Sequence, residues 1–159
     1  MSGVLAAVTM VAALGSALTA GVFFGFSNFI MRALARVEPP VGVAAMQSIN
    51  VVVINPLFMI ALFGTGLIGA VLGVWAVVGD VGGGAPYLLA GAALYLIGTV
   101  GVTMAYNVPR NNALAELDPQ HQDTAARWSE YVSSWTGGNS VRAACALLAA
   151  GAFIVALIA

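Results

Sequence analysis

The sequence predicts an all-α integral membrane protein, a four-helix bundle with an additional amphipathic interfacial helix between its third and fourth helices. Three observations predict this fold. Hydrophobic residues make up 61% of the 159 residues and charged residues only 7%, whereas about a quarter of the residues in a soluble domain are charged. The chain contains four apolar runs of roughly the 20 residues that cross a bilayer core. These runs lack the alternating pattern of barrel strands, which favours helices.

The first span is expected over residues 4–31. A cleaved signal peptide is the competing interpretation of this run. However, Met1–Leu5 contains no basic residue, and the apolar stretch continues well beyond the core of a signal peptide. We therefore assign the run to the first membrane helix, within a single membrane domain that covers residues 1–159.

The second span is expected over residues 51–78 and contains Pro56. Within a continuous helix, this proline removes one backbone hydrogen bond and its ring clashes with the preceding turn, which would kink the helix. Alternatively, Asn55 is an N-cap and Pro56 the first residue of a new helix, so that residues 41–54 form a separate interfacial helix. We favour the kink, because the stretch before Asn55 contains no obvious helix stop.

The third and fourth spans are expected over residues 87–106 and 139–159, separated by the interfacial segment 107–138. In this segment, Asp118 and Pro119 have the residue types of a helix start. Apolar side chains then recur at steps of three and four and form one stripe: Trp128, Tyr131, Val132 and Trp135. We expect an amphipathic helix that ends at Gly137 and Gly138, followed by a new helix from Asn139.

The four spans place both termini and the 79–86 turn on one side of the membrane. The other side holds residues 32–50 and 107–138, and it carries all five basic residues: Arg32, Arg36, Arg110, Arg127 and Arg142. Because the cytoplasmic side of membrane proteins is enriched in basic residues, we expect a multi-pass protein of the cell membrane with both termini outside. The net charge of −1 and the lack of a basic cluster argue against a nucleic-acid partner.

Strongly polar side chains are concentrated near the predicted cytoplasmic ends of the spans. They are Ser27, Asn28, Gln47, Asn50, Asn55, Asn107, Asn111, Asn112, Asn139 and Arg142. Unpaired polar groups at membrane depth are costly, so this concentration predicts a shared hydrogen-bonded cluster or a ligand site. Two simpler interpretations stay open: the tryptophans and Tyr131 as an interfacial aromatic belt, and Arg142 as a topological anchor.

Residues for metal binding or acid–base chemistry are scarce. No residues have the spacing of a metal site, and the sequence contains neither a Ser-His-Asp set nor a phosphate-binding loop. The only histidine, His121, lies in the charged segment and is interpreted as an incidental solvated residue. Glu130 is the acid best placed to face Arg127 or Arg142. We expect no metal and no cofactor.

Five motifs in register across nearly the whole chain resemble the anthrone oxygenase-like family of small four-helix membrane proteins. They are GVFFGFSNFIM at 21–31, MQSIN at 46–50, NPLF at 55–58, NVPRNN at 107–112, and the set Trp128, Tyr131, Trp135, Thr136, Asn139 and Arg142. The resemblance implies oxidation of polyketide anthrones to anthraquinones by dioxygen, apparently without metal or flavin. It therefore implies a membrane-embedded, cofactor-independent oxygenase or oxidase for a hydrophobic polyphenolic compound.

Under this hypothesis, the polar end of the bundle binds and activates the substrate. The candidate catalytic residues are Arg142, Asn50, Asn112 and Asn139, and the candidate substrate-binding residues are Asn28, Gln47, Asn107, Asn111, Trp128, Tyr131 and Trp135. Such donors stabilise developing negative charge most strongly in a water-poor site. The alternative is a non-enzymatic membrane protein that binds a lipid, a quinone or a partner helix in the same pocket. The expected partners are a hydrophobic small molecule or lipid and the membrane, and a homo-oligomer is left open.

Overall fold

The computed structural model describes residues 2–159, and the regular structure within them is entirely helical. Its segments, in chain order, are α1 (Gly3–Gly25), η1 (Phe26–Ile30), α2 (Met31–Leu34), α3 (Pro39–Val52), α4 (Pro56–Met59), η2 (Ile60–Gly64), α5 (Thr65–Val78), η3 (Gly82–Gly84), α6 (Ala85–Ala93), η4 (Leu94–Gly101), η5 (Thr103–Asn107), α7 (Val108–Ala115) and α8 (Thr124–Ile158). Segments η1, η2, η4 and η5 are π-helical, and η3 is a 3₁₀ turn.

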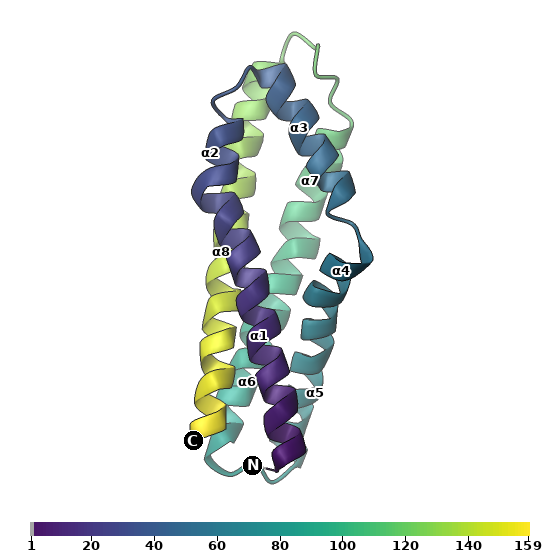
Figure 1. The fold of residues 1–159 in the computed structure, drawn as a ribbon. Coiled ribbons are helices and arrows are strands. Elements are labelled where there is room, and N and C mark those ends of the chain that lie inside the picture. Colours follow the sequence, from purple (N-terminus) through teal and green to yellow (C-terminus); the bar gives the residue numbers. More distant parts are fainter. Residues whose placement is uncertain (1) are drawn as a thin grey trace.

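Apart from α3, these segments join end to end into the long helices of one bundle (Figure 1). Within residues 2–159, four helices are long and apolar enough to cross a membrane: Gly3–Leu34, Pro56–Val78, Gly82–Ala115 and Thr124–Ile158. The predicted all-α, four-helix membrane bundle is therefore confirmed. Both termini lie at the end of the bundle opposite α3 (Figure 1).

The predicted kink at Pro56 is wrong, because the chain leaves the helix after Val52 and starts a new one at Pro56. Asn55 has an extended backbone, with φ −124° and ψ 157°, and its Oδ1 accepts a hydrogen bond of 3.0 Å from the backbone N–H of Phe58. Proline disfavours helical geometry at the residue before it, and an asparagine N-cap stabilises the new start. The alternative with a separate α3 is the one the structure adopts.

The predicted helix break at Gly137 and Gly138 is also wrong, because α8 is continuous from Thr124 to Ile158. The segment 107–138 therefore contains no separate interfacial helix, and the predicted helix start at Asp118 is replaced by turns that lead to Thr124. A mid-helix glycine costs only about 1 kcal/mol relative to alanine, which the packing of a long helix readily offsets.

The third long helix extends beyond the predicted end at residue 106 and includes Pro109. Proline inside a helix leaves one carbonyl without its donor and crowds the preceding turn. The π-helical turn η5 lies directly before α7, and such local changes of register accommodate proline in membrane helices.

The half of the bundle nearest the termini, here called the packed half, is formed by α5, α6 and the adjoining parts of α1 and α8. Small residues let these helices approach closely, as is typical of membrane bundles. A Cβ atom added at Gly91 would lie 2.8 Å from Cδ1 of Phe153, and one added at Gly73 would lie 3.0 Å from Cβ of Ala92. The buried core of this half includes Ala12, Leu72, Leu88, Ala149 and Phe153.

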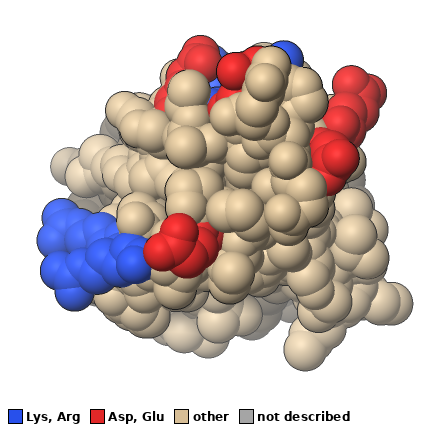
Figure 2. Space-filling view, turned by 90° about the horizontal axis from the view of Figure 1, so that it is seen from above, with Lys and Arg blue, Asp and Glu red and all other residues tan. Residues whose placement is uncertain are grey.

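A second buried cluster holds α3 against α7 and α8 at the opposite end of the molecule. Its members are Met31, Val43, Met46, Leu114, Leu117, Trp128, Tyr131 and Trp135. Gln47 adds a polar clamp, because its Nε2 donates to the carbonyls of Leu114 at 2.8 Å and Leu117 at 2.9 Å. Leu114 lies in the last turn of α7, where its carbonyl also accepts from the backbone N–H of Leu117 at 3.1 Å, and Leu117 follows the end of the helix. Figure 2 looks down on this end and shows basic and acidic side chains on it.

Candidate functional site

A cavity of about 620 Å³ lies in the half of the bundle that contains η1, η2, η5, α3 and α7, here called the open half. The volume is in the usual range for small-molecule pockets. The lining residues are mostly apolar, and the polar ones are Gln47, Asn50, Thr103, Asn107, Asn111, Asn112 and Arg142. Seven of the eleven predicted site residues line this one cavity. They are the polar residues Gln47, Asn50, Asn107, Asn111, Asn112 and Arg142, and the aromatic residue Trp135.

π-Helical segments surround this cavity. Segment η1 contributes Phe26, η2 contributes Leu62 and Phe63, and η5 contributes Met104 and Asn107. A π-type turn is wider than an α-turn and is frequent at functional sites. Because the hydrogen-bond register changes at such a turn, a backbone carbonyl becomes free to accept from a side chain.

Arg142 lies on the inner wall of the cavity, in α8, with only 5% of its surface exposed. Its Nη1 donates to Thr103 Oγ1 at 3.1 Å, and its Nη2 donates to Asn139 Oδ1 at 2.7 Å. Its guanidinium carbon lies 4.0 Å from the centre of the Phe23 ring. This burial leaves little of the guanidinium exposed for the headgroup contact that a topological anchor makes.

No carboxylate of residues 2–159 lies within ion-pair distance of Arg142. The guanidinium Nε is buried and has no hydrogen-bond partner in the same residues. A buried charge without a counter-charge is costly, and the contact with the Phe23 ring offsets only part of this cost. An anionic ligand in the cavity would supply the missing partner.

Asn139 is completely buried behind Arg142 and does not line the cavity. Its Nδ2 donates to the backbone carbonyl of Phe23 at 2.6 Å and to Ser27 Oγ at 2.7 Å. Phe23 precedes η1, where the helical register changes. Asn139 therefore holds the guanidinium in place and links it to the first long helix.

Two asparagines present unpaired polar atoms at the cavity. Asn107 donates through Nδ2 to the carbonyl of Trp135 at 3.1 Å, and its Oδ1 is buried without a partner in residues 2–159. The Nδ2 of Asn50 is likewise buried and unpartnered there. Buried polar groups normally form hydrogen bonds, so these atoms mark positions for ligand groups, one donor and one acceptor.

Asn111 organises the aromatic wall. Its Oδ1 accepts hydrogen bonds from Trp135 Nε1 at 2.7 Å and from the hydroxyl of Tyr131 at 3.0 Å. Tyr131 stacks between Trp135 and Trp128, with centroid distances of 6.2 and 5.7 Å. All three rings are buried, so they are not an interfacial belt, and of the three only Trp135 lines the cavity.

The remaining predicted residues have different positions. Asn112 is exposed and lies at the edge of the cavity. Asn28 is exposed and faces a separate surface groove between α1 and α8, so it does not join the other site residues. Gln47 touches the cavity, but its amide is engaged by the end of α7.

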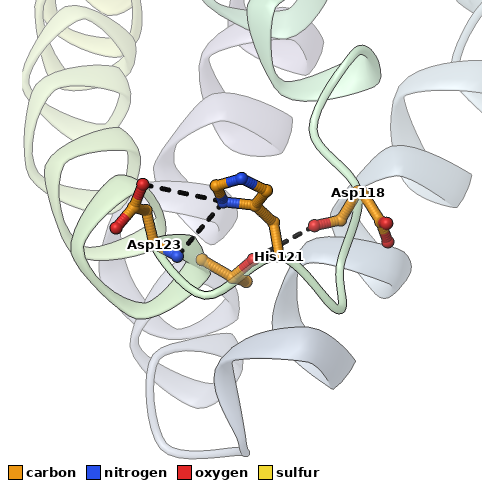
Figure 3. A network of polar contacts seen from close by, with 4 residues as sticks. Asp118, His121 and Asp123 are labelled. Carbon is orange, nitrogen blue, oxygen red and sulfur yellow. Dashed lines mark hydrogen bonds and ion pairs between the residues drawn. The ribbon is translucent and has the colours of Figure 1, made fainter.

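The charged loop before α8 lies apart from the cavity lining. Figure 3 shows Asp118, His121 and Asp123 in this loop, where the Nδ1 of His121 accepts from the backbone N–H of Asp123 at 3.2 Å. His121 does not line the cavity, and neither does any carboxylate from the described residues. Glu130 is exposed and forms no ion pair with Arg127 or Arg142 in residues 2–159, contrary to expectation. Those residues also contain no cluster of three or more His, Cys, Asp or Glu that could hold a metal ion.

Sequence reasoning missed Thr103, which receives the Arg142 hydrogen bond and passes one on to the carbonyl of Thr99 at 2.7 Å. A signal was present, because Thr99, Thr103, Asn107 and Asn111 recur every four residues. Residues at this spacing lie on one face of a helix. The apolar lining residues Phe23, Phe63 and Met104 carry no such signal.

A family model described as anthrone oxygenase matches residues 56–152. The chain belongs to the anthrone oxygenase family. No curated protein and no solved structure matches the chain. The family match includes Thr103, Asn107 and Arg142, whereas α1 and α3 contribute Phe23 and Asn50 to the site from outside it.

Proposed function

We propose that the protein is a membrane-embedded oxygenase that oxidises a hydrophobic polyphenolic, anthrone-like compound with dioxygen and without a cofactor. The observation that carries this proposal is the buried, unpaired guanidinium of Arg142 on the wall of a largely apolar cavity. Such a site selects a flat apolar molecule that develops negative charge on oxygen. Membership of the anthrone oxygenase family supports the same chemistry.

The proposed reaction converts a ring CH₂ group and O₂ into a ketone and water. Loss of one proton from the CH₂ group gives a carbanion, whose charge is delocalised onto the ring-ketone oxygen. The carbanion is oxidised by O₂ and forms a C–O bond, which gives a peroxide anion that takes up a proton. The hydroperoxide then loses water: its O–O bond breaks, the remaining hydrogen of the carbon leaves, and C=O forms.

In this scheme, Arg142 stabilises the oxygen that carries the carbanion charge. Its Nε and the Nδ2 of Asn50 are the unpaired donors, and the Oδ1 of Asn107 is an unpaired acceptor for a substrate hydroxyl. Preorganised donors in a low-dielectric site favour the anion without reorganisation. Trp135 provides an aromatic wall, and Asn139 and Thr103 orient the guanidinium.

The proton acceptor is water at the edge of the cavity near Asn112. Arg142 is the one ionisable side chain among the described residues that line the cavity. The site therefore acts by lowering the pKa of the substrate rather than through a protein base. Dioxygen, an apolar gas, reaches the site from the bilayer.

The lack of a lining carboxylate or imidazole also favours a second candidate, a non-enzymatic protein that binds a lipid or quinone in the same cavity. The two candidates differ in oxygen uptake. An enzyme consumes one O₂ per substrate, whereas a binding protein retains the compound unchanged.

The test is anthrone oxidation by purified protein in detergent under ¹⁸O₂. The proposal predicts one labelled oxygen in the ketone and one in water, and protein free of stoichiometric metal or flavin. Arg142→Gln is expected to lower kcat/KM by about 100-fold or more, as when an oxyanion donor is removed. Arg32→Gln is the control, since Arg32 is exposed and outside the cavity. Equal rates of anthrone oxidation for wild type, Arg142→Gln and empty detergent would refute the proposal that the protein is an enzyme.

We also propose that the cavity opens near the cytoplasmic side of the cell membrane and that both termini are outside. Support comes from four arginines: Arg32 in α2, Arg36 in the loop after it, Arg110 in α7 and Arg127 in the first turn of α8. These segments lie at the end of the bundle opposite the termini (Figure 1). A reporter enzyme that works only outside the cytoplasm should be active when fused to the C-terminus. A reporter that works only in the cytoplasm should be inactive there.

A further inference from the structure

The rim of the cavity is formed by residues that line the cavity and are also exposed on the outer surface. Met104 is 55% exposed and Ile54 is 72% exposed. Val51 and Phe63 are further apolar members of this rim. The cavity therefore opens sideways, between the α3–α4 junction and η5.

Two apolar helices border this opening. Phe63 and Met104 belong to two of the four helices that are long and apolar enough to cross it, Pro56–Val78 and Gly82–Ala115. The rim residues carry no charge, so lipid chains can touch them without cost. This apolar part of the rim is separate from the polar edge at Asn112, where water has access.

The inner wall has the opposite character, because its polar groups are buried. Arg142, Asn107 and Asn50 lie there with unpaired atoms. One continuous cavity thus runs from buried polar groups to an exposed apolar rim. A ligand that fills it needs a polar head inside and an apolar part that reaches the bilayer.

We infer that the natural ligand is a hydroxylated aromatic compound with a long alkyl or isoprenoid tail, whose tail passes over Met104 and Ile54 into the bilayer. This inference rests on the proposed function for the identity of the head group. The continuity of cavity and rim favours a tailed molecule over a partner helix, because the side of a helix would cover the rim without reaching Arg142.

The tail has a specific consequence for binding. The tail of such a compound stays in the membrane while its head enters the cavity. The opening must therefore admit the head and then remain open around the tail. A compound without a tail needs the opening only during entry. Narrowing the rim should therefore weaken binding of tailed compounds selectively.

The experiment compares 4-nitrophenol with 2-dodecyl-4-nitrophenol, two phenols with the same head. Binding is measured in lipid nanodiscs, with each concentration expressed per lipid to remove the effect of partitioning. Wild type should bind both phenols. Met104→Trp, which places a large ring at the rim, should weaken binding of the tailed phenol by about tenfold and change that of the tailless phenol by less than about twofold.

Ile97→Trp is the matched control, because Ile97 is 72% exposed on the same long helix and does not line the cavity. It should leave the affinities for both phenols unchanged. Ile54→Trp is a second rim variant on the opposite side of the opening and should repeat the effect of Met104→Trp.

Failure of the tailed phenol to bind wild type, or equal effects of the rim variants on both phenols, would overturn the inference. This readout is separate from turnover. Selective loss at the rim without anthrone oxidation would keep the tailed ligand and reject the oxygenase. Anthrone oxidation by the protein, with no effect of the rim variants on binding of the tailed phenol, would keep the oxygenase and reject the tailed ligand.

Discussion

The packed half and the open half of the bundle use the same four helices for opposite purposes. In the packed half, small residues bring the helices together, and Phe153 and Leu72 are completely buried. In the open half, larger side chains and π-helical turns hold the helices apart around a cavity of about 620 Å³. Tyr95 lies where the halves meet, since its hydroxyl donates to the carbonyl of Leu62, a lining residue, at 3.1 Å.

This difference teaches how a small membrane protein maintains a cavity. In lipid, apolar surface gains little from burial, so helix association depends on close packing and hydrogen bonds. The packed half supplies the packing. The open half relies on specific hydrogen bonds, such as those of Gln47 and Asn139. We therefore expect substitutions in the packed half to lower stability and substitutions in the open half to lower activity.

The largest effect is expected for Phe153→Ala in the packed half. Phe153 is completely buried and packs against Gly91, so its truncation leaves a cavity. We expect a loss of about 3 kcal/mol in the free energy of unfolding, measured by denaturant titration in detergent. Phe24→Ala, at an exposed residue of α1, should cost less than about 0.5 kcal/mol. Equal losses for the two variants would show that the packed half does not carry the stability.

A smaller effect, and one on activity, is expected for Gly138→Ala in the open half. The added Cβ would lie 2.7 Å from Cε1 of Tyr106 and 2.9 Å from Oδ1 of Asn107, so Asn107 must move. We expect turnover of an anthrone to fall by about tenfold, which corresponds to about 1.4 kcal/mol.

The neighbouring residue provides the control. A Cβ at Gly137 would meet no atom within 4 Å, so Gly137→Ala should keep full turnover. If both alanine variants are equally active, the position of Asn107 does not matter for the reaction.

The smallest effect is expected for Gln47→Leu, which removes the clamp between α3 and α7. The carbonyls of Leu114 and Leu117 lose the two hydrogen bonds from the Gln47 amide, which should cost about 1 kcal/mol and speed hydrogen exchange across Pro39–Val52. Ser48→Ala, at the exposed neighbouring residue, should leave exchange unchanged. Unchanged exchange in Gln47→Leu would show that the apolar contacts of α3 suffice.

The sequence predicted the membrane helices and the polar end of the site, because hydropathy reports directly on transfer into lipid. It could not decide between a kink and a break at Pro56, since both satisfy the same local rules. At Gly137 and Gly138 local propensity was overridden by packing: Gly138 lies where Tyr106 approaches α8, a contact that the sequence does not encode locally.

The division of the site residues was equally hidden. Asn28 and Asn139 both lie near the end of an apolar run. However, Asn28 is exposed, whereas Asn139 is completely buried. Which side of a helix a residue faces depends on helix rotation, and each π-helical turn changes that rotation. The four π-helical segments leave no pattern in the sequence, so the faces of three long helices could not be assigned beyond them.

The claim that Arg142 stabilises an anion in the open half has a direct spectroscopic test. The phenolate of 4-nitrophenol absorbs at longer wavelength than the neutral phenol, so the ionised fraction of bound ligand can be read at a pH below its solution pKa. Wild type and Arg32→Gln should bind the phenolate, and Arg142→Gln should bind the neutral phenol or none. Equal phenolate fractions in wild type and Arg142→Gln would contradict the assignment of Arg142.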